Sequence, residues 1–342
     1  MSSAEEDGRT APSIPPVIPA KIGPPAVRLD TVPRPRLVER LEASDARVTL
    51  VSAPAGAGKS VLALEWLRGK GRPSAWLSLD ALDSGPPRFV AHLLEALTGG
   101  DPPILPPGRD ASVRQSVGTG SWAAKLLSLL AEVDPDSVVV LDDVQTLAAG
   151  PVTDFLEELL TGFPSGPRVM VLTRTDPPIR LGRLRLSGDL LEIRQNDLRF
   201  TEEEAAELFR RSLPFELDRA LVRRLEDRTE GWAAGLRLTA LALERADDPG
   251  ATAEAFLEAR ELIVEYLLEE VLGSQPAELQ QFLMDTAVLP RFNREACEHI
   301  TGDPRASDRL DEVEEANLFL IAHRRRGGWY RYHHLFRELL TL

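Results

Sequence analysis

The sequence predicts an α/β domain with a parallel sheet, followed by an all-α domain and a winged-helix domain. Three features lead to this prediction. Apolar, β-branched runs alternate with helical patterns as far as about Arg199, helical patterns alone follow, and the chain ends with a strand, a Gly-Gly turn, a second strand and a helix. We therefore expect domains at residues 26–199, 200–250 and 251–342.

The first 25 residues precede these domains and contain the proline-rich stretch "APSIPPVIPAKIGPP". Proline lacks a backbone N–H and fixes φ, so this stretch suits neither a helix interior nor a central strand. We expect residues 1–25 to form a disordered or extended arm.

In the first domain, short strands alternate with helices. The predicted strands are "RVTLVSA", "PSAWLSLD", "SVVVLDDV", "RVMVLTR" and "LLEIR", and the predicted helices are "KSVLALEWLRGK", "PPRFVAHLLEAL" and "PVTDFLEELL". The run "SVVVLDDV" is apolar until it reaches the aspartates, as expected for a strand buried on both faces of a parallel sheet. This alternation implies a parallel sheet that is covered by helices on both faces.

Beyond residue 200 the pattern becomes helical. Thr201 and Glu204 have the spacing of a capping box at the start of "FTEEEAAELFRR". Two further helices follow, broken around Gly231, and the all-α domain is expected to end in the loop "ADDPGATAE". More helices are predicted from Ala253 to about Glu315, before the winged tail "LFLIAHRRRGGWYRYHHLFRELL".

The composition is that of an ordinary soluble globular protein. With 40 basic and 54 acidic residues, the net charge of −14 repels nucleic-acid phosphate overall, so DNA binding would need a local basic patch. The single cysteine, Cys297, excludes an intrachain disulfide and lies in a helical pattern as a buried apolar residue. No apolar run approaches the ~18 residues of a membrane span and no signal peptide begins the chain, so we expect a cytoplasmic protein.

The segment "APAGAGKS", residues 53–60, matches the phosphate-binding pattern G-x-x-x-x-G-K-[ST] except that Ala53 takes the first position. In such a loop, successive backbone N–H groups and the positive end of the next helix face anionic oxygens. Lys59 is expected to reach the β- and γ-phosphates, and Ser60 to offer its hydroxyl to Mg²⁺. The residues expected to bind nucleotide are Ala55, Gly56, Ala57, Gly58, Lys59, Ser60 and Val61. The strand before and the helix after the loop make this a sheet of the P-loop NTPase kind.

Two acidic residues and an arginine follow later strands. Asp142 ends an apolar strand, which places it at the carboxyl edge of the sheet near a magnesium ion beside Ser60. Asp143 could then orient or deprotonate an attacking water. Arg174 ends the next strand, where it could face the γ-phosphate and report whether it is present, or simply cap the strand at the surface.

Taken together, these motifs resemble the nucleotide-binding oligomerisation module of MalT-like LuxR-family transcription regulators, which are STAND-class ATPases. The resemblance runs from about Lys21 to the end of the chain and includes "RLDTVPRPRLVERL", "SAPAGAGKS", "AWLSLDALDSGPPRFVAHLLEAL", "VLDDV", "VLTRTDPP", "LRFTEEEAAELF", "EGWAAGLRL", "EYLLEEVL" and "YRYHHLF". In this family a small residue such as alanine is usual before "PAG", so the resemblance implies that Ala53 is tolerated.

The resemblance also implies contacts with the adenine and ribose. Val32, Arg36 and Leu37 are the candidates that precede the first strand. Trp232 lies in "GWAAGL", where the family often has proline after the tryptophan, so Ala233 departs from the pattern and puts the local adenine contact in doubt.

In the winged-helix domain, His333 matches the histidine through which the family senses the β-phosphate of ADP. Judged without the family, it would be taken for a buried core histidine. The basic run Arg324, Arg325 and Arg326 beside the Gly-Gly turn is interpreted as a solvated wing, with DNA contact as the alternative.

The resemblance implies a regulatory switch that binds ATP, ADP and Mg²⁺. ADP would hold the module closed through His333, ATP would allow self-association, and slow hydrolysis would reset the switch. DNA would be reached only through a C-terminal domain absent from these 342 residues.

Two alternatives remain open from the residues alone. One is a P-loop enzyme, an ATPase or a small-molecule kinase, with Arg183 and Arg185 as possible lid residues; Arg185 could equally touch a neighbouring subunit. The other is a nucleotide-independent adaptor, which the set of Lys59, Ser60 and Asp142 disfavours.

Overall fold

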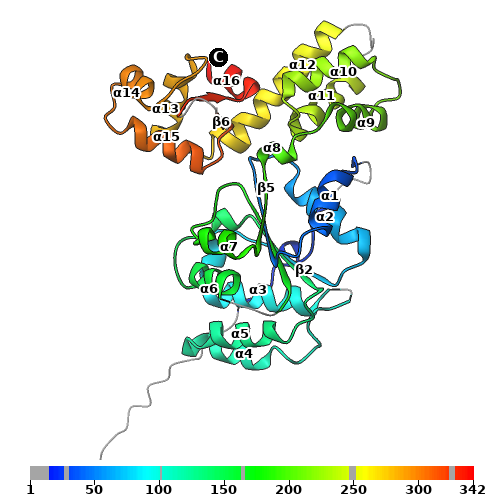
Figure 1. Ribbon diagram of the computed structural model, residues 1–342, viewed down its shortest axis with the longest axis vertical. Coiled ribbons are helices and arrows are strands. Elements are labelled where there is room, and N and C mark those ends of the chain that lie inside the picture. Colours follow the sequence, from blue (N-terminus) through cyan, green and yellow to red (C-terminus); the bar gives the residue numbers. More distant parts are fainter. Residues whose placement is uncertain (1–14, 27–30, 101, 163–165, 246–251, 323–327) are drawn as a thin grey trace, which may run out of the picture.

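A computed structural model describes residues 15–26, 31–100, 102–162, 166–245, 252–322 and 328–342. The chain forms two bodies (Figure 1): the sheet with its helices lies at one end, and α9 to α16 lie at the other. The short helix α8 (Gln195–Leu198), which directly follows the edge strand β5, lies at the junction between them. No described helix is long and apolar enough to cross a membrane.

Within the described residues, five parallel strands form one sheet in the order β2-β3-β4-β1-β5. The strands are β1 (Val48–Ser52), β2 (Ser74–Ser78), β3 (Val138–Asp142), β4 (Arg168–Thr173) and β5 (Leu190–Arg194). All residues of β1 and β3 are buried, which explains why these strands show no alternation of polar and apolar residues. The predicted parallel sheet is confirmed.

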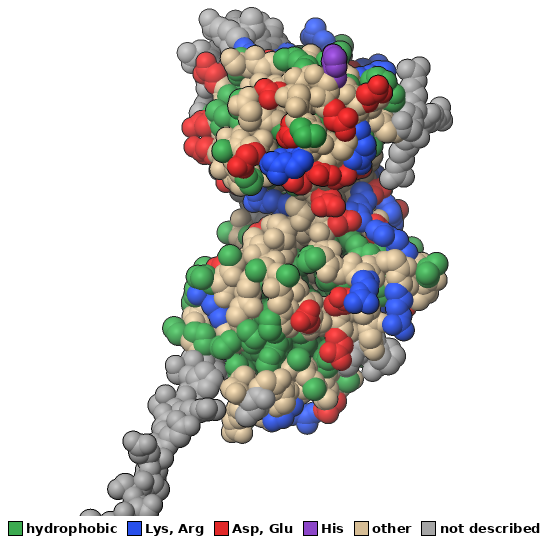
Figure 2. Space-filling model, turned by 90° about the vertical axis from the view of Figure 1, so that its left-hand side faces the viewer, with side chains coloured by type: hydrophobic (Ala, Val, Ile, Leu, Met, Phe, Trp, Pro, Cys, Tyr) green, Lys and Arg blue, Asp and Glu red, His purple; other side chains and the backbone are tan. Residues whose placement is uncertain are grey.

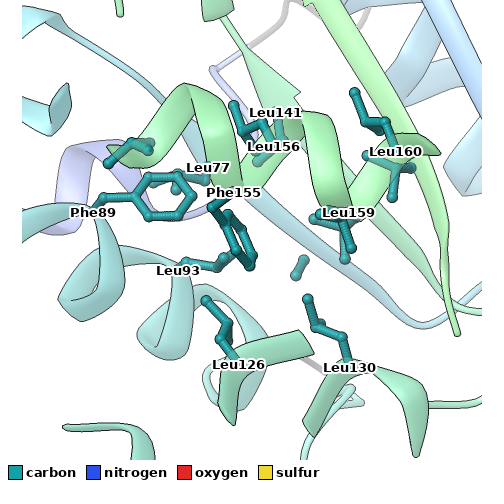
Figure 3. Close-up of a cluster of buried hydrophobic side chains, with 14 of the residues drawn as sticks. Leu77, Phe89, Leu93, Leu126, Leu130, Leu141, Phe155, Leu156, Leu159 and Leu160 are labelled. Atoms are coloured by element: carbon teal, nitrogen blue, oxygen red, sulfur yellow. The ribbon is translucent and has the colours of Figure 1, made fainter. Parts of the chain in front are cut away.

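Helices cover both faces of this sheet. The predicted helices are α2 (Lys59–Lys70), α3 (Pro86–Thr98) and α6 (Pro151–Thr161). On one face, α3, α5 (Trp122–Ala131) and α6 meet around Phe89, Trp122 and Phe155, whose ring centroids lie 5.2–6.3 Å apart. Figure 3 shows Phe89 and Phe155 in this cluster. On the other face, α2 buries Leu62, Trp66 and neighbouring side chains against β1, β3 and β4.

Several helices of the first body were not predicted. They are α1 (Pro35–Glu42), α4 (Ala111–Ser116), α5 (Trp122–Ala131) and α7 (Leu181–Ser187). The helix α5 buries Trp122, Leu126 and Leu130, so it belongs to the main core of the sheet body.

Of the two alternatives given for residues 1–25, a disordered or an extended arm, the structure has an ordered, partly extended arm where it describes that stretch. Residues Pro19–Lys21 form a 3₁₀ turn, Ile22 makes an antiparallel bridge to Leu77, and the N–H of Gly23 donates to Trp76 O at 3.0 Å. Lys21 binds the fully buried carboxylate of Asp83. The arm is held in place because it covers the open edge of β2, whose backbone groups would otherwise lack partners. Residues 1–14 lie outside the described residues.

The second body begins with α9 (Glu202–Ser212), α10 (Arg219–Thr229) and α11 (Ala233–Arg245). The capping box of Thr201 and Glu204 is confirmed, and so is the break at Gly231, which has φ +67°. Most of the predicted loop "ADDPGATAE" lies in residues 246–251, outside the described residues, and a helix already begins at Thr252.

The rest of this body has a winged-helix arrangement. It comprises α12 (Thr252–Leu267), continued by a π-helix (Leu268–Leu272), then α13 (Ala277–Ala287), α14 (Arg294–Thr301), α15 (Ala306–Glu315), β6 (Leu320–Ala322), β7 (Tyr330–Tyr332) and α16 (His334–Leu340). The strands β6 and β7 pair antiparallel. The arginine run 324–326 and Gly327 fall outside the described residues. Cys297 is buried, as predicted.

Candidate nucleotide-binding site

The glycine-rich loop connects the carboxyl end of β1 to the start of α2. Gly56 and Gly58 have φ of +68° and +89°, in the left-handed region that side chains rarely adopt. A Cβ added to Gly56 would come within 2.5 Å of the Ala234 Cβ, so the space here excludes a side chain. Ala53 shows no positive φ and continues the strand, with its N–H donating to Thr173 O at 3.2 Å. Alanine therefore fits the first position of this loop.

Lys59 is buried at the first residue of α2, inside the loop. Its ammonium group donates to the carbonyl oxygens of Ala53 and Pro54, at 2.8 and 3.0 Å. Burial and the nearby Arg174 lower the pKa of Lys59 to about 8, against the opposing pull of Asp143 and Asp142. Burial removes water from the Lys59 ammonium group, so an anionic ligand in the loop would strongly stabilise its positive charge.

Ser60 and Asp142 meet directly. The Ser60 hydroxyl donates to Asp142 Oδ2 at 2.9 Å, although the two residues are 82 positions apart in the sequence. Burial, and then the neighbouring Asp143 charge, raise the pKa of Asp142. Because these are the hydroxyl and carboxylate oxygens that Mg²⁺ prefers, the donor set fits such an ion.

Asp143 is a non-glycine residue with φ +59°, and Gln145 fixes its side chain. The Gln145 amide donates from Nε2 to Asp143 Oδ1 at 2.8 Å. Its oxygen accepts from the Arg174 N–H at 2.9 Å and from the Thr173 hydroxyl at 3.1 Å. Gln145 thus joins the acidic pair at the end of β3 to the end of β4. Gln145 was not predicted, because its one signal in the sequence is a polar side chain that follows the acidic pair by two positions.

Arg174 lies at the carboxyl edge but is also bound by the second body. Its guanidinium lies 3.9 Å from Asp143 Oδ1, 3.5 Å from Glu270 Oε2, and donates to Glu270 O at 3.2 Å. Asn317 Nδ2 donates to Arg174 O at 2.8 Å and to the Ser52 hydroxyl at 3.1 Å. A cavity of about 380 Å³ here is lined from both bodies, by Pro54, Ala55, Asp143, Gln145, Arg174, Glu270, Asn317, Phe319 and their neighbours.

A more apolar cavity of about 400 Å³ lies beside the loop. Val32 and Val61 line it, together with Gly56, Gly58, Arg34, Phe200 and Ala233. Its size and apolar lining suit a planar base and sugar.

Arg34 and Arg237 line this cavity, whereas the predicted Arg36 does not. The Arg36 guanidinium instead binds Glu204 at 2.8 Å and backbone oxygens of residues 197 and 199, away from the cavity. Arg34 is 2% exposed, lies 4.6 Å from the Phe200 ring centroid, and has its pKa lowered to about 10 by burial. Leu37, the remaining candidate here, is packed in the core beneath α2.

The start of α11 closes over the loop. Trp232 Nε1 donates to Ala55 O at 3.0 Å, and the Ala234 N–H donates to Gly56 O at 3.0 Å. The Trp232 ring packs against Tyr266 and Phe319, with centroids 5.6 and 5.2 Å away. Trp232 therefore links the glycine-rich loop to the winged-helix side.

His333 is 1% exposed and lies next to Trp232, with ring centroids 6.3 Å apart. Its Nε2 hydrogen-bonds Thr229 O at 2.9 Å, so Nε2 carries the proton and donates. Its Nδ1 is buried and has no hydrogen-bond partner among the described residues. A small cavity joins His333 to Pro54 and Ala57 of the loop. Burial lowers the pKa of His333 to about 4.

Comparisons with known proteins agree with this architecture. Residues 268–341 match the family model of the MalT winged helix domain. The HTH-type transcriptional regulator MalT of Cronobacter sakazakii is 34% identical over 336 residues, covering 95% of this chain and 36% of that protein. MalT of Serratia proteamaculans is 31% identical over 331 residues, with the same coverage of 95% and 36%. The chain thus spans about a third of the length of these relatives.

Among solved structures, the Walker-type ATPase PABY2304 of Pyrococcus abyssi superposes with a TM-score of 0.68. The superposition covers 94% of this chain and 99% of that chain, at 13% identity. At that identity the likeness is one of fold, and it confirms the P-loop ATPase architecture.

Proposed function

The chain is related to the MalT-type HTH transcriptional regulators across 95% of its length and carries their winged-helix domain, and we propose that it is the nucleotide-responsive switch module of such a regulator. In this proposal the module binds ADP in a closed state and ATP in a state that self-associates. Slow hydrolysis of ATP returns it to the closed state. The module reaches DNA only through a part of the regulator outside these 342 residues.

The convergence of Lys59, Ser60 and Asp142 at one end of the sheet carries this proposal. Lys59 would neutralise phosphate charge from within the glycine-rich loop, and Ser60 and Asp142 would hold Mg²⁺. A bound Mg²⁺ would neutralise further charge on the phosphates. The cavity lined by Val32, Arg34 and Val61 receives the base and sugar.

Hydrolysis in this proposal depends on Asp143, Gln145 and Arg174. Asp143 orients the attacking water and accepts its proton. Gln145 holds the Asp143 carboxylate through a bond of 2.8 Å, and Arg174 faces the γ-phosphate. Since the Arg174 guanidinium is also bound by Glu270, a γ-phosphate competes with this residue of the second body for the arginine side chain.

His333 is the proposed contact to ADP in the closed state. Its neutral ring has its one N–H committed to Thr229 O, so only a protonated ring can also donate from Nδ1 to a phosphate oxygen. The buried Nδ1 without a partner among the described residues supports this role.

The test begins with mass spectrometry of the nucleotide that co-purifies with the protein, followed by calorimetry with ADP, ATP and Mg²⁺. We expect bound ADP, heat on adding either nucleotide, and slow ATP turnover. Lys59→Ala should abolish binding and ATP-dependent assembly. A protein that gives no heat with adenine nucleotides would rule the proposal out, and rapid turnover that needs a small-molecule acceptor would indicate a kinase instead.

A further inference from the structure

The carboxylate of Glu230 joins three separate parts of the chain. Glu230 lies between α10 and α11 and accepts two hydrogen bonds from Arg331 of β7, to Oε1 at 2.7 Å and Oε2 at 2.8 Å. The His334 N–H, at the start of α16, donates to Oε1 at 3.0 Å. Arg199, in the segment that follows the sheet, donates to Oε2 at 3.2 Å.

Two of these contacts flank His333. Arg331 and His334 lie on either side of it in the sequence, and both bind the same carboxylate. The residue before Glu230 supplies the third constraint, because Thr229 O hydrogen-bonds the His333 ring. Two consecutive residues of the all-α part thus act on the β7–α16 junction. Glu230 fixes its backbone, and Thr229 fixes the ring of His333.

The backbone at Glu230 is unusual for a residue with a side chain. Its φ is +49°, and Gly231, which follows, has φ +67°. A Cβ at Gly231 would lie 2.6 Å from Phe200 O, so the chain turns here in very little space. Glycine would adopt the conformation of Glu230 with less strain, and residues held in such conformations concentrate at switches and ligand sites.

The surroundings of Glu230 keep its carboxylate ionised and in a fixed position. Its side chain is 11% exposed. Burial acts to raise the pKa of Glu230, but the bonds from Arg331 and His334 and the nearby His333 outweigh it and lower the pKa to about 2. A bidentate arginine–carboxylate pair of this kind is stronger and more directional than an exposed ion pair.

We propose that Glu230 is a positioning residue that holds His333 beside the glycine-rich loop and so makes nucleotide retention depend on the docking of β7 and α16 against the all-α part. The proposal rests on the function proposed above, in which His333 contacts ADP. Without the carboxylate, the backbone on either side of His333 is held less firmly, although the bond from the ring to Thr229 O and the loop are unchanged.

Two variants separate this role from a purely structural one. Glu230→Gly relieves the backbone strain, so a residue that served only the turn would be replaced without loss. Glu230→Gln keeps an acceptor for the His334 N–H but removes the charge that binds Arg331 and Arg199. Glu338→Gln is the control, because the Glu338 carboxylate joins α16 to α10 and α12 through partly exposed ion pairs with Arg228 and Arg260 and is paired with neither Arg331 nor Arg199.

The first readout is the dissociation rate of a fluorescent ADP analogue from the full chain, at constant Mg²⁺. Loss of a charge-assisted pair should raise this rate by roughly ten- to a hundredfold in Glu230→Gly, and by less in Glu230→Gln. Glu338→Gln should release the analogue at the wild-type rate. Wild-type release from both Glu230 variants, or equal acceleration by Glu338→Gln, would overturn the proposal.

The second readout is hydrogen–deuterium exchange without nucleotide. Peptides that cover residues 328–340 should exchange faster in both Glu230 variants, while those of α2 and α3 stay protected. Unchanged exchange in residues 328–340 would overturn the proposal. Because this measurement needs no ligand, it tests separately whether Glu230 holds β7 and α16 in place. A wild-type protein that binds no ADP would instead end the proposed function and, with it, the link from Glu230 to nucleotide retention.

Discussion

Gln145 makes hydrogen bonds in two directions at the carboxyl edge of the sheet. Its amide nitrogen binds Asp143, and its oxygen accepts from Arg174 N and Thr173 Oγ1. Only this orientation of the amide satisfies both sides, because a carboxylate cannot donate and an N–H cannot accept. The residue therefore aligns two proposed catalytic groups without contacting a phosphate itself.

We predict that Gln145→Met lowers ATP turnover by about 10²-fold, since Asp143 loses its orientation as a general base. The affinity for ATP should stay near the wild-type value, because the loop and the base cavity are untouched. Steady-state hydrolysis and calorimetry measure the two quantities. Gln275→Met is the control and should hydrolyse ATP normally, because Gln275 lines the same cavity but its side-chain amide donates to Val271 O and the Ser274 hydroxyl. A loss of binding equal to the loss of turnover would contradict this role.

His333 makes the free energy of unfolding depend on pH. The burial of its ring sets the direction of this dependence. An unfolded histidine titrates near 6.5, and burial lowers the pKa of His333 to about 4 in the folded chain. The unfolded state thus binds the proton first, so this residue's contribution to stability is complete above pH 6.5 and is lost as the pH falls toward 4.

As the pH falls, protonation linked to His333 should lower the free energy of unfolding by at most about 3 kcal/mol. Urea unfolding without nucleotide at pH 7.0 and pH 4.5 should show it, and His333→Gln, which can still donate to Thr229 O, should lose less over the same interval. Glu230 contributes in the same direction, but its pKa of about 2 places that loss at lower pH. Equal pH dependence in the wild type and in His333→Gln would refute the assignment.

At the scale of elements, α5 lies far from the glycine-rich loop but supports the sheet from which that loop extends. Its residues Trp122, Leu126 and Leu130 face α3 and α6, and Figure 3 shows Leu126 and Leu130 pointing toward Phe155 and Leu159. This cluster lies against β3, whose last residue is Asp142.

Leu126→Ala should lower the free energy of unfolding by about 2–5 kcal/mol, because it opens a cavity in a packed core. Leu126 is 0% exposed, whereas Leu186 on α7 is 92% exposed. Leu186→Ala is therefore the matched control and should leave stability within about 0.5 kcal/mol of the wild type. Urea denaturation of both variants measures the difference. Similar stabilities for the two would mean that α5 does not belong to the cooperative core.

At the scale of the whole molecule, the two bodies meet across charged and polar contacts. Figure 2 shows acidic and basic side chains gathered along the narrow waist between them. Asn317 and Glu270 reach from the winged-helix side to Arg174, and Asn317 does so from a strained conformation with φ +47°. Polar interfaces of this kind are typical of bodies that move relative to one another.

The double variant Asn317→Ala with Glu270→Gln should weaken the contact between the two bodies at the Arg174 backbone and the hold of the Glu270 carboxylate on the Arg174 guanidinium, which then becomes available to a γ-phosphate. We expect the affinity for ATP relative to ADP to rise by roughly three- to tenfold, since hydrogen bonds of this kind contribute about 1 kcal/mol each. Competition calorimetry measures the ratio, and small-angle X-ray scattering should show a more extended molecule. Glu312→Gln, which removes an ion pair within α15 alone, should change neither. An unchanged ATP to ADP ratio in the double variant would show that this contact does not regulate the site.

The sequence by itself determined the parallel sheet, the glycine-rich loop, the acidic residues at the end of β3 and the winged tail. These features are local, because each depends on the period of apolar residues or on the spacing of a short motif within one segment. The break at Gly231 and the capping box at Thr201 are local in the same sense.

Only the tertiary structure decided which side chains meet. Arg34 and Arg36 are two positions apart at the start of one helix. Arg34 packs over the Phe200 ring and lines the cavity, whereas Arg36 binds Glu204 and lies away from it. Asn317 meets Ser52 across 265 positions of sequence, and Glu230 meets Arg331 across 101. No periodic pattern encodes such pairs, because they exist only after distant parts of the chain have folded and packed together.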